Sequence, residues 1–466
     1  MFSFDIKEHR FNHVHFIGIG GISMSGLAEI LLMEGYKVSG SDMKNSLILN
    51  KLKTQGADIF LGHRAENINN ANLVIYTDAI SKDNPELLES KKRAIPTIDR
   101  GNFLGMIMKN YKHSIAVSGT HGKTTTTSML STIFKNSTLD PTILLGGELD
   151  DIGGNVLMGG KDLLLTEACE YKGNILKYRP TMAIILNMEE DHLDYFRNID
   201  HIVNTFSEYA AIIKKDGYLI INLDDKHSKK VINTSHCNII TFGINNQSDY
   251  VAENISYAQD GYPKFILNVK GKKHYTVELN VMGVHNIYNA LASIAAASIC
   301  NVPMEDIIHS IKEYRGTHRR LETKGYSNNI KIVDDYAHHP TEIKASLAAL
   351  KRTKPKNLWC IFQPHTYSRT KLLLNEFSES FYDADKIIIT DIYAAREKDT
   401  GIIHAKDLVA LLQKKGVDAI YMSSFESIKN YLLENAVPED LIVTMGAGNI
   451  YQIGDMLLEE NRKKAI

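Results

Sequence analysis

One loop of this 466-residue sequence has the residue types of a phosphate-binding site. Gly119-Thr120-His121-Gly122-Lys123-Thr124 stands between a short apolar run and a stretch with helical spacing, expected from Thr125 to Phe134. Glycines let backbone N–H groups approach phosphate oxygens, and a helix start adds positive potential. Lys123 can then reach the β- and γ-phosphates of a nucleotide, and the Thr124 hydroxyl can ligate Mg²⁺. Because Val117 stands where the general motif requires glycine, a glycine turn with a chance Lys-Thr pair is the alternative.

A second glycine-rich turn lies near the N-terminus. Gly18-Ile19-Gly20-Gly21-Ile22-Ser23 follows an apolar run and nearly matches G-x-G-x-x-G, with Ser23 in the last glycine position. Asp42 ends the next expected strand, at the place of an acidic contact to a ribose. Such a turn holds the pyrophosphate of a dinucleotide or of a UDP-sugar, or it is purely structural, and the motif alone does not decide.

Carboxylates and a histidine follow two further apolar runs. Glu167 comes after Leu163 to Leu165, and Asn187, Glu189, Asp191 and His192 come after Met182 to Leu186. Ligands bind beyond the carboxyl ends of parallel strands, so both segments are expected to point toward the phosphate loop. A carboxylate and an imidazole there could hold Mg²⁺ beside the γ-phosphate. The alternatives are a solvated strand end for Glu167 and a helix-start residue for His192.

The alternation of apolar runs with helical patterns starts three times along the chain. It indicates an α/β protein of three domains with largely parallel sheets. We expect an N-terminal Rossmann-like domain over 1–108, a central P-loop-type ATP-binding α/β domain over 109–322, and a C-terminal Rossmann-like domain over 323–466.

Composition excludes several classes of protein. Hydrophobic residues make up 44% and charged residues 23%, which is typical of a globular chain, and the formal net charge is -2. Neither a nucleic acid nor a membrane is therefore expected as a partner. No apolar run reaches the ~20 residues that span a bilayer, and Met1 to Arg10 lacks the apolar core of a signal peptide. The four cysteines are widely spaced, as in a reduced, cytoplasmic protein, and we expect Cys169 to be a small semi-buried residue rather than a nucleophile.

With these residues placed, the sequence resembles the Mur ligases over essentially its whole length, most closely the branch that adds L-alanine. Seven ordered segments are far more specific than any single one, and the short phosphate loop is the family's own form. The matching segments are Gly18 to Met24, Ser118 to Thr127, Asn187 to His192, Gly283 to Ala290, Arg319 to Glu322, Asp334 to Pro340 and Gln363 to Arg369.

The resemblance implies ATP and Mg²⁺ as cofactors, and UDP-N-acetylmuramate and L-alanine as substrates of a cytoplasmic monomer or homodimer that makes a peptidoglycan precursor. It implies catalytic roles for Lys123, Glu167, His192 and Arg320, with Mg²⁺ on Thr124, Glu167 and His192. The implied ATP contacts are Gly119, Thr120, His121, Gly122, Lys123, Thr124, Thr125, His285, Asn286, Arg320 and Asp335. The implied contacts to the nucleotide sugar are Gly18, Gly20, Gly21, Ser23, Met24, Asp42, Thr77, Ala79 and Ile80. Tyr336, His338, His365 and Arg369 would line the amino-acid site.

Two positions depart from the family pattern. Glu167 and Glu170 match the family pattern, but Lys172 stands where the family often has aspartate. Thr366 stands where arginine is frequent beside the amino acid, so carboxylate binding would depend more on Arg369. No residue here matches the carbamylated lysine of sibling ligases, which agrees with the alanine-adding branch.

The implied chemistry is activation of a carboxylate as an acyl phosphate, followed by attack of an amine. The base that deprotonates the amine is not identified, and His192 is a candidate only if a metal does not fully occupy it. Three alternatives remain: the recycling branch of the family, which adds a peptide to the same nucleotide sugar, a nicotinamide dehydrogenase, and a non-catalytic nucleotide sensor.

Overall fold

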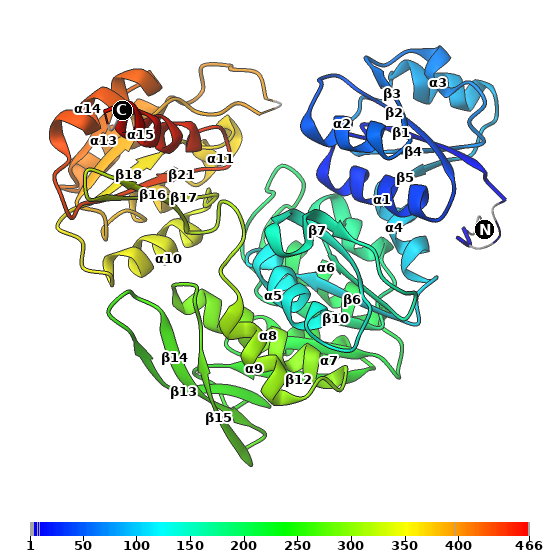
Figure 1. The fold of residues 1–466 in the computed structure, drawn as a ribbon, viewed down its shortest axis with the longest axis horizontal. Coiled ribbons are helices and arrows are strands. Elements are labelled where there is room, and N and C mark those ends of the chain that lie inside the picture. The colour runs from blue at the N-terminus through cyan, green and yellow to red at the C-terminus, as the bar shows by residue number, and fades with distance from the viewer. Residues whose placement is uncertain (1–3, 7, 9, 396, 465–466) are drawn as a thin grey trace. The chain divides into compact units, whose positions relative to one another are not determined.

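The computed structural model describes residues 4–6, 8, 10–395 and 397–464, and it contains three β-sheets flanked by helices (Figure 1). Contacts between Cα atoms group the chain into two compact units, which are described separately. The first comprises the chain up to Asp191, Tyr195–Tyr250 and Leu291–Ser310. The second comprises His192–Asp194, Val251–Ala290 and the chain from Ile311 onward.

The first unit begins with a five-stranded parallel sheet in the order β3-β2-β1-β4-β5. Its strands are β1 His13–Ile17, β2 Lys37–Asp42, β3 Asp58–Leu61, β4 Leu73–Tyr76 and β5 Thr97–Asp99. The helices are α1 Ile22–Met33, α2 Leu47–Thr54, η1 Ala65–Ile68, α3 Pro85–Lys92 and α4 Arg100–Met108. Side-chain oxygens of Ser46, Asn84 and Asp99 cap α2, α3 and α4, which explains why these helices start there.

The strand order changes direction between β1 and β4, where ligands bind in open α/β sheets. The glycine turn from Gly18 follows β1, and the segment from Thr77 follows β4. The loops expected to hold a nucleotide sugar therefore meet at this switch point.

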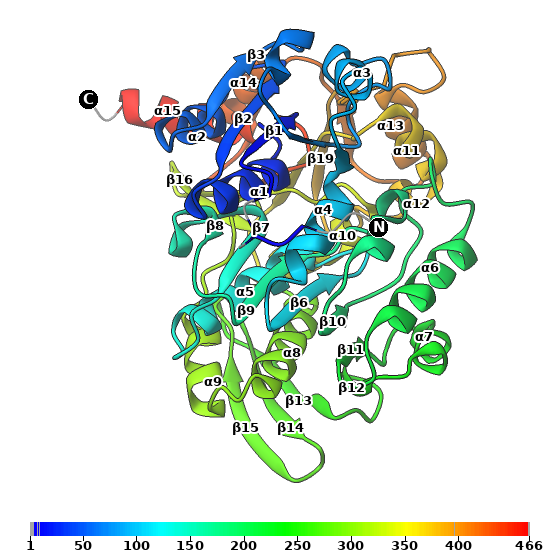
Figure 2. The same cartoon turned by 90° about the vertical axis from the view of Figure 1, so that its right-hand side faces the viewer.

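A second group of strands in the first unit runs in the order β12-β11-β10-β6-β9-β7-β8, parallel except for the β7–β8 hairpin. Its strands are β6 His113–Ser118, β7 Thr142–Leu149, β8 Gly154–Leu157, β9 Leu163–Glu167, β10 Met182–Ile185, β11 Tyr218–Asn222 and β12 Asn238–Gly243. Its helices are α5 Lys123–Lys135, η2 Asp150–Ile152, η3 Tyr171–Lys177, α6 Ile199–Ile212 and α7 Ser228–Thr234. Figure 2 shows α6 and α7, which pack against each other beside β11 and β12.

The central position of β6 decides what surrounds the phosphate loop. β6 pairs with β9 on one side and β10 on the other, all parallel. The carboxyl ends of these three strands therefore lie at one edge, which brings Glu167 and the segment from Asn187 to the loop from Gly119.

The second unit contains β14 Pro263–Val269, β15 Lys273–Glu278 and, apart from Tyr250, the strand β13 Tyr250–Tyr257. Their order is β15-β14-β13, with β14 and β15 antiparallel. Helices α8 Val284–Ile299 and α9 Met304–Glu313 each have residues in both units. A six-stranded sheet follows in the order β16-β17-β21-β18-β19-β20, parallel except for the β16–β17 hairpin. Its strands are β16 Glu322–Ser327, β17 Ile330–Asp335, β18 Leu358–Phe362, β19 Lys386–Ile389, β20 Ala419–Tyr421 and β21 Leu441–Met445.

Helices cover both faces of that sheet because its strands are apolar on both sides. Leu358, Cys360 and Phe362 of β18 belong to one hydrophobic cluster, while Trp359 and Ile361 belong to another. The first cluster includes residues of α10, α12 and α13, and the second includes residues of α14 and α15. The helix bounds are α10 Pro340–Lys351, α11 Tyr367–Leu372, α12 Leu374–Ser378, α13 Ala405–Lys414, α14 Phe425–Asn435 and α15 Tyr451–Lys464.

The predicted α/β class and the mainly parallel sheets are confirmed. The antiparallel hairpins β7–β8, β14–β15 and β16–β17 were not predicted, because their short alternating strands carry weak apolar signals. Helix α5 begins at Lys123 instead of Thr125, since Gly122 adopts a left-handed conformation and acts as its N-cap. Among the described residues, no helix combines the length and apolar character needed to cross a membrane.

Candidate active site

The phosphate loop joins β6 to α5 and depends on two glycines. Gly122 has φ 83° and Gly119 has φ 133°, a region that only glycine adopts readily. A Cβ on Gly119 would lie 3.0 Å from Leu186 Cβ and 3.1 Å from the Asn187 nitrogen. The loop therefore connects a strand to a helix, as the sequence predicts, and packs closely against the segment after β10.

Hydrogen bonds attach this loop to the segment after β10. The Thr120 N–H donates to the Asn187 carbonyl (3.1 Å), and the His121 N–H donates to Asn187 Oδ1 (2.8 Å). Asn187 Nδ2 donates back to the His121 carbonyl (3.1 Å), and the Glu189 N–H donates to Thr120 Oγ1 (2.9 Å). The predicted meeting of these two segments is thus present.

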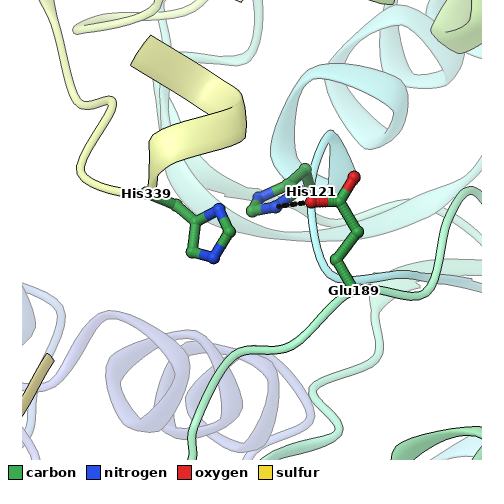
Figure 3. Close-up of side chains that lie close together, drawn as sticks. All are labelled: His121, Glu189 and His339. Atoms are coloured by element: carbon green, nitrogen blue, oxygen red, sulfur yellow. Dashed lines mark ion pairs between the residues drawn. The ribbon is translucent and has the colours of Figure 1, made fainter. Parts of the chain in front are cut away.

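Figure 3 shows the His121 ring beside the Glu189 carboxylate, with Nε2 and Oε2 3.5 Å apart. The third residue drawn, His339, belongs to the second unit, where it is the N-cap of α10.

Lys123 folds back over the loop from the first turn of α5. Its Nζ donates to the carbonyls of Gly119 and Thr120 and lies 3.2 Å from each carboxylate oxygen of Glu170. Glu170 is only 2% exposed. Burial by itself would lower the pKa of Lys123, but the negative charge of Glu170 raises it above its usual value. The lysine is therefore firmly protonated where a phosphate would bind.

Two oxygen ligands of the kind that Mg²⁺ prefers lie next to Lys123. Thr124 Oγ1 donates to Glu167 Oε2 (3.2 Å), and the Gly146 N–H donates to Glu167 Oε1 (2.7 Å). Glu167 is the last residue of β9 and does not follow it. A hydroxyl and a carboxylate already directed at each other fit a hard divalent cation, so the residues present agree with the predicted metal site.

His192 lies in the loop after β10, with φ 53°. It falls in the second unit, whereas Thr124 and Glu167 fall in the first. Its predicted place beside Glu167 stays a prediction.

The N-terminal glycine turn is tied to the strands on either side. Gly18 has φ 83°, and its N–H donates to the Ser41 carbonyl (2.8 Å). The Gly20 N–H donates to Asp42 Oδ2 (3.0 Å), and a Cβ on Gly20 would lie 2.9 Å from that oxygen. A Cβ on Gly18 would lie 2.6 Å from Thr77 Cγ2. The structure therefore brings Gly18, Gly20, Asp42 and Thr77 together.

The other residues predicted to bind the nucleotide sugar differ in accessibility. Ser23 and Ile80 are partly exposed and Ala79 is exposed, whereas the Met24 side chain is 1% exposed and lies in the hydrophobic core. Met24 can therefore contact a ligand only through its backbone. Gly21 starts α1 as its N-cap.

The predicted ATP residues of the second unit include two that are strongly buried. Asn286 is 6% exposed, its Nδ2 donates to the Met282 carbonyl (2.7 Å), and its Oδ1 accepts from Asn289 Nδ2 (2.9 Å). These contacts hold the Asn286 side-chain amide against the first turn of α8. Asp335 is 3% exposed and accepts from Ser346 Oγ (2.6 Å) and the Ala337 N–H (3.0 Å).

Burial shifts the pKa values of two of these residues, and nearby charges modify the shifts. Burial raises the pKa of Asp335 to about 6, although Ser346 and Arg320 act in the opposite direction. Burial also lowers the pKa of His285 to about 4, with Glu342 opposing and Arg320 contributing. Since Arg320 affects both groups, His285, Asp335 and Arg320 share one neighbourhood. The Arg320 guanidinium lies over the Tyr336 ring, 5.1 Å from its centroid.

Three of the residues predicted to bind the amino acid, Tyr336, His338 and His365, have rings that contact one another in sequence and are called the ring group below. The centroids of Tyr336 and His338 are 5.4 Å apart, and those of His338 and His365 are 5.7 Å apart. Arg369 Nη1 lies 3.2 Å from His365 Nδ1. Thr366, where the family often has arginine, caps α11 by accepting from the Arg369 N–H (3.4 Å). The threonine thus supports the helix that carries Arg369.

Sequence reasoning missed one residue, Tyr393, and one pairing, that of Glu170 with Lys123, at these sites. The Tyr393 ring stacks on His365 with centroids 5.8 Å apart, and its place just beyond β19 was the available signal. The pairing of Glu170 with Lys123 spans 47 residues, and no local pattern reveals it. Cys169 stays a structural residue, because burial raises the pKa of its thiol and disfavours the thiolate.

These features define a three-domain α/β protein with a nucleotide-type phosphate loop, and comparison with known proteins gives its family. Residues 13–112 match the Mur ligase catalytic domain, 117–297 the Mur ligase middle domain, and 319–448 the Mur ligase glutamate ligase domain. The chain belongs to the Mur ligase family.

Two similar sequences carry the same enzyme name. The chain is 52% identical over 462 residues to the UDP-N-acetylmuramate–L-alanine ligase of Acetivibrio thermocellus, covering 99% of this chain and 98% of that protein. It is 52% identical over 459 residues to the same enzyme of Caldanaerobacter subterraneus subsp. tengcongensis, covering 98% and 100%.

Solved structures agree with this placement. The UDP-N-acetylmuramate–alanine ligase of Thermotoga maritima matches with a TM-score of 0.82 and 27% identity, over 97% of this chain and 99% of that one. A murein peptide ligase from Psychrobacter arcticus matches with a TM-score of 0.70 and 26% identity, over 96% and 98%.

Proposed function

We infer that this protein is an ATP-dependent ligase that joins L-alanine to the lactyl carboxylate of UDP-N-acetylmuramate, in the synthesis of a peptidoglycan precursor. The observation that supports it best is the meeting of Lys123, Thr124 and Glu167 at the carboxyl edge of β6 and β9. A full-length identity of 52% to alanine-adding ligases identifies the substrates.

The first chemical task is to make a carboxylate reactive. A carboxylate is a poor electrophile, and phosphoryl transfer from ATP converts it to an acyl phosphate. Lys123 binds the transferred phosphate and balances charge as it develops, together with Arg320. Mg²⁺, held by Thr124, Glu167 and His192, would supply further neutralisation of the phosphate oxygens.

The nucleotide sugar binds at the switch point of the N-terminal sheet in this proposal. The N–H groups of the first turn of α1, which follows the glycine turn from Gly18, approach its diphosphate, and the segment from Thr77 to Ile80 forms the other side. The tight packing of Gly18 on Thr77 supports this role because it holds the two loops together.

The amine is bound by the ring group of the second unit. Arg369 is the cation for the carboxylate of L-alanine, and Tyr336, His338 and His365 enclose the small side chain. The neutral amine then attacks the acyl carbon and inorganic phosphate leaves. The nitrogen loses a proton as the amide forms.

We also propose the domain bounds, the location and the oligomeric state of the protein. The domains end near residues 108 and 322, the protein works in the cytoplasm, and it is a monomer or a homodimer. Its substrates are small molecules.

The experiment measures phosphate release from ATP with Mg²⁺ and UDP-N-acetylmuramate, with either L-alanine or a cell-wall tripeptide as the amine. Release and amide product with L-alanine are expected. Product with the tripeptide alone would assign the chain to the recycling branch. Absence of release with both amines, in a folded sample that binds ATP, would contradict the ligase mechanism.

A further inference from the structure

Asn174 connects the predicted nucleotide-sugar loop to the segment that follows the metal carboxylate. It lies in η3, and its Nδ2 donates to Asp78 Oδ2 (2.8 Å) and to the Tyr171 carbonyl (2.9 Å). Its Oδ1 accepts from Lys177 Nζ (2.8 Å). Asp78 stands inside the Thr77–Ile80 segment, 96 positions away in sequence.

The orientation of the Asn174 amide is fixed by its partners. Both N–H groups of Nδ2 have an acceptor, and the carbonyl faces an ammonium group, so a flipped amide would place donors against Lys177. The side chain is 2% exposed, and a Cβ on Gly101 would lie 2.6 Å from its Oδ1. This site is closely packed and has one arrangement of hydrogen bonds.

The same segment reaches the phosphate loop at its other end. Glu170, which holds Lys123 through both carboxylate oxygens, directly precedes η3. Lys172 and Gly173 have left-handed backbones (φ 54° and 67°), which turn the chain between Glu170 and Asn174. Asn174, the partner of the sugar loop, therefore lies only four positions after Glu170, the partner of the phosphate-loop lysine.

We propose that Asn174 is a positioning residue that sets the distance between the bound nucleotide sugar and the phosphate loop. This inference rests on the proposed function. Acyl phosphate formation requires the carboxylate and the γ-phosphate to approach within ~3–3.5 Å, and a 1 Å error costs about 100-fold in rate. A residue that joins the two loops controls that approach without touching either substrate.

The first test is Asn174→Ala in the full chain, with kcat and KM measured for all three substrates. We expect kcat to fall about 10- to 100-fold, while KM for ATP and for UDP-N-acetylmuramate stays within about threefold. Lys161→Ala is the matched control. This variant removes the ion pair between Lys161 Nζ and Glu34 Oε2 (2.7 Å), which also joins the N-terminal sheet's helix α1 to the chain before β9 but lies at the C-terminal end of α1. It should leave kcat unchanged.

The second test exchanges the polar groups of the contact. Asn174→Asp keeps the side-chain shape but places a carboxylate against Asp78, and should lower kcat at least as far as alanine does. Adding Asp78→Asn restores a donor opposite the new carboxylate but not the bond to the Tyr171 carbonyl, so the double variant should recover in part, with a kcat at least about threefold above that of Asn174→Asp alone.

Two results would overturn the proposal. One is a kcat for Asn174→Ala that matches Lys161→Ala, and the other is a loss for Asn174→Asp that Asp78→Asn does not rescue in a folded protein. Wild-type protein without product from L-alanine would instead contradict the proposed function itself.

Discussion

Lys123 and its neighbours show how a local motif acquires its charge environment from a distant residue. The loop presents the lysine, but the buried carboxylate of Glu170 keeps it protonated and directs it over the loop. A phosphate must therefore compete with Glu170 for the ammonium group. Lys123 thus exchanges one anionic partner for another, so its ammonium group keeps an anionic partner when a phosphate binds.

Lys123→Ala should lower the rate of phosphate release at least about 100-fold, because the cation that binds the transferred phosphate is lost. The measurement is kcat/KM for ATP in the L-alanine assay, with circular dichroism to confirm folding. Lys135→Ala, at the other end of α5, is the control and should retain the wild-type value. A Lys123→Ala variant with more than a tenth of wild-type activity would contradict this role.

Asp335 gives a prediction for the pH dependence of stability. Burial raises the pKa of this carboxyl to about 6 in the folded protein, from 3.8. Between these values the folded state binds more protons than the unfolded state, so this residue adds stability as pH falls through about 6. Above pH 6, the ionised buried carboxylate costs roughly 3 kcal/mol at most, at about 1.4 kcal/mol for each pKa unit.

Asp335→Asn should therefore be more stable than wild type at pH 7.5, and the difference should shrink as pH falls toward 4.5. Thermal unfolding at several pH values measures it. Asp418→Asn, on an exposed carboxylate, should show no such trend. A difference that grows toward acid would show that the sign is wrong.

At the scale of elements, the start of α5 depends on the conformation of one glycine. Gly122 is the N-cap with φ 83°, and the helix starts immediately after it. The first N–H groups of α5 therefore face the loop, where they bind anions. The packing of the loop on Leu186 and Asn187 adds the second constraint, at Gly119.

Gly122→Ala should destabilise the protein by about 1 kcal/mol and weaken ATP binding, because an L-residue is strained in that conformation. Gly153→Ala is the control, since Gly153 also has a positive φ (69°) but a Cβ there would meet nothing within 4 Å. It should cost similar stability and leave KM for ATP unchanged. Equal effects of both variants on KM would contradict a specific role of Gly122.

At the scale of the whole molecule, the first two sheets share one hydrophobic core. A single cluster of buried residues includes Phe16 and Phe103 from the N-terminal sheet and its helices. It also includes Leu164 of β9, Tyr178, which follows η3, and Phe206 of α6. Helix α4 contacts η3 so closely that a Cβ on Gly105 would lie 2.1 Å from the Lys177 carbonyl oxygen. These two sheets should therefore unfold together.

Gly105→Ala should lower stability by about 1–3 kcal/mol and reduce kcat, because overpacking separates α4 from η3. Scanning calorimetry should show one transition for the first unit in wild type, shifted to lower temperature in the variant. Lys109→Ala, on the exposed end of the same helix, should change neither quantity. An unchanged melting temperature for Gly105→Ala would contradict a shared core held by the contact of α4 with η3.

The sequence by itself determined the α/β class and the phosphate loop, because both depend on neighbours within a few positions. Apolar runs at β6, β10 and β18 predict buried strands, and the glycines next to Lys123 predict the turn. It also identified the group Tyr336, His338 and His365 through family resemblance, and these rings do lie together.

The tertiary structure decided which distant segments meet. Glu170 lies 47 positions from Lys123, and Asn174 lies 96 positions from Asp78. Both pairings follow from strand order, which places β9 beside β6 and carries η3 back to α4. Strand order depends on how apolar faces pack throughout the chain, and short sequence patterns do not encode it.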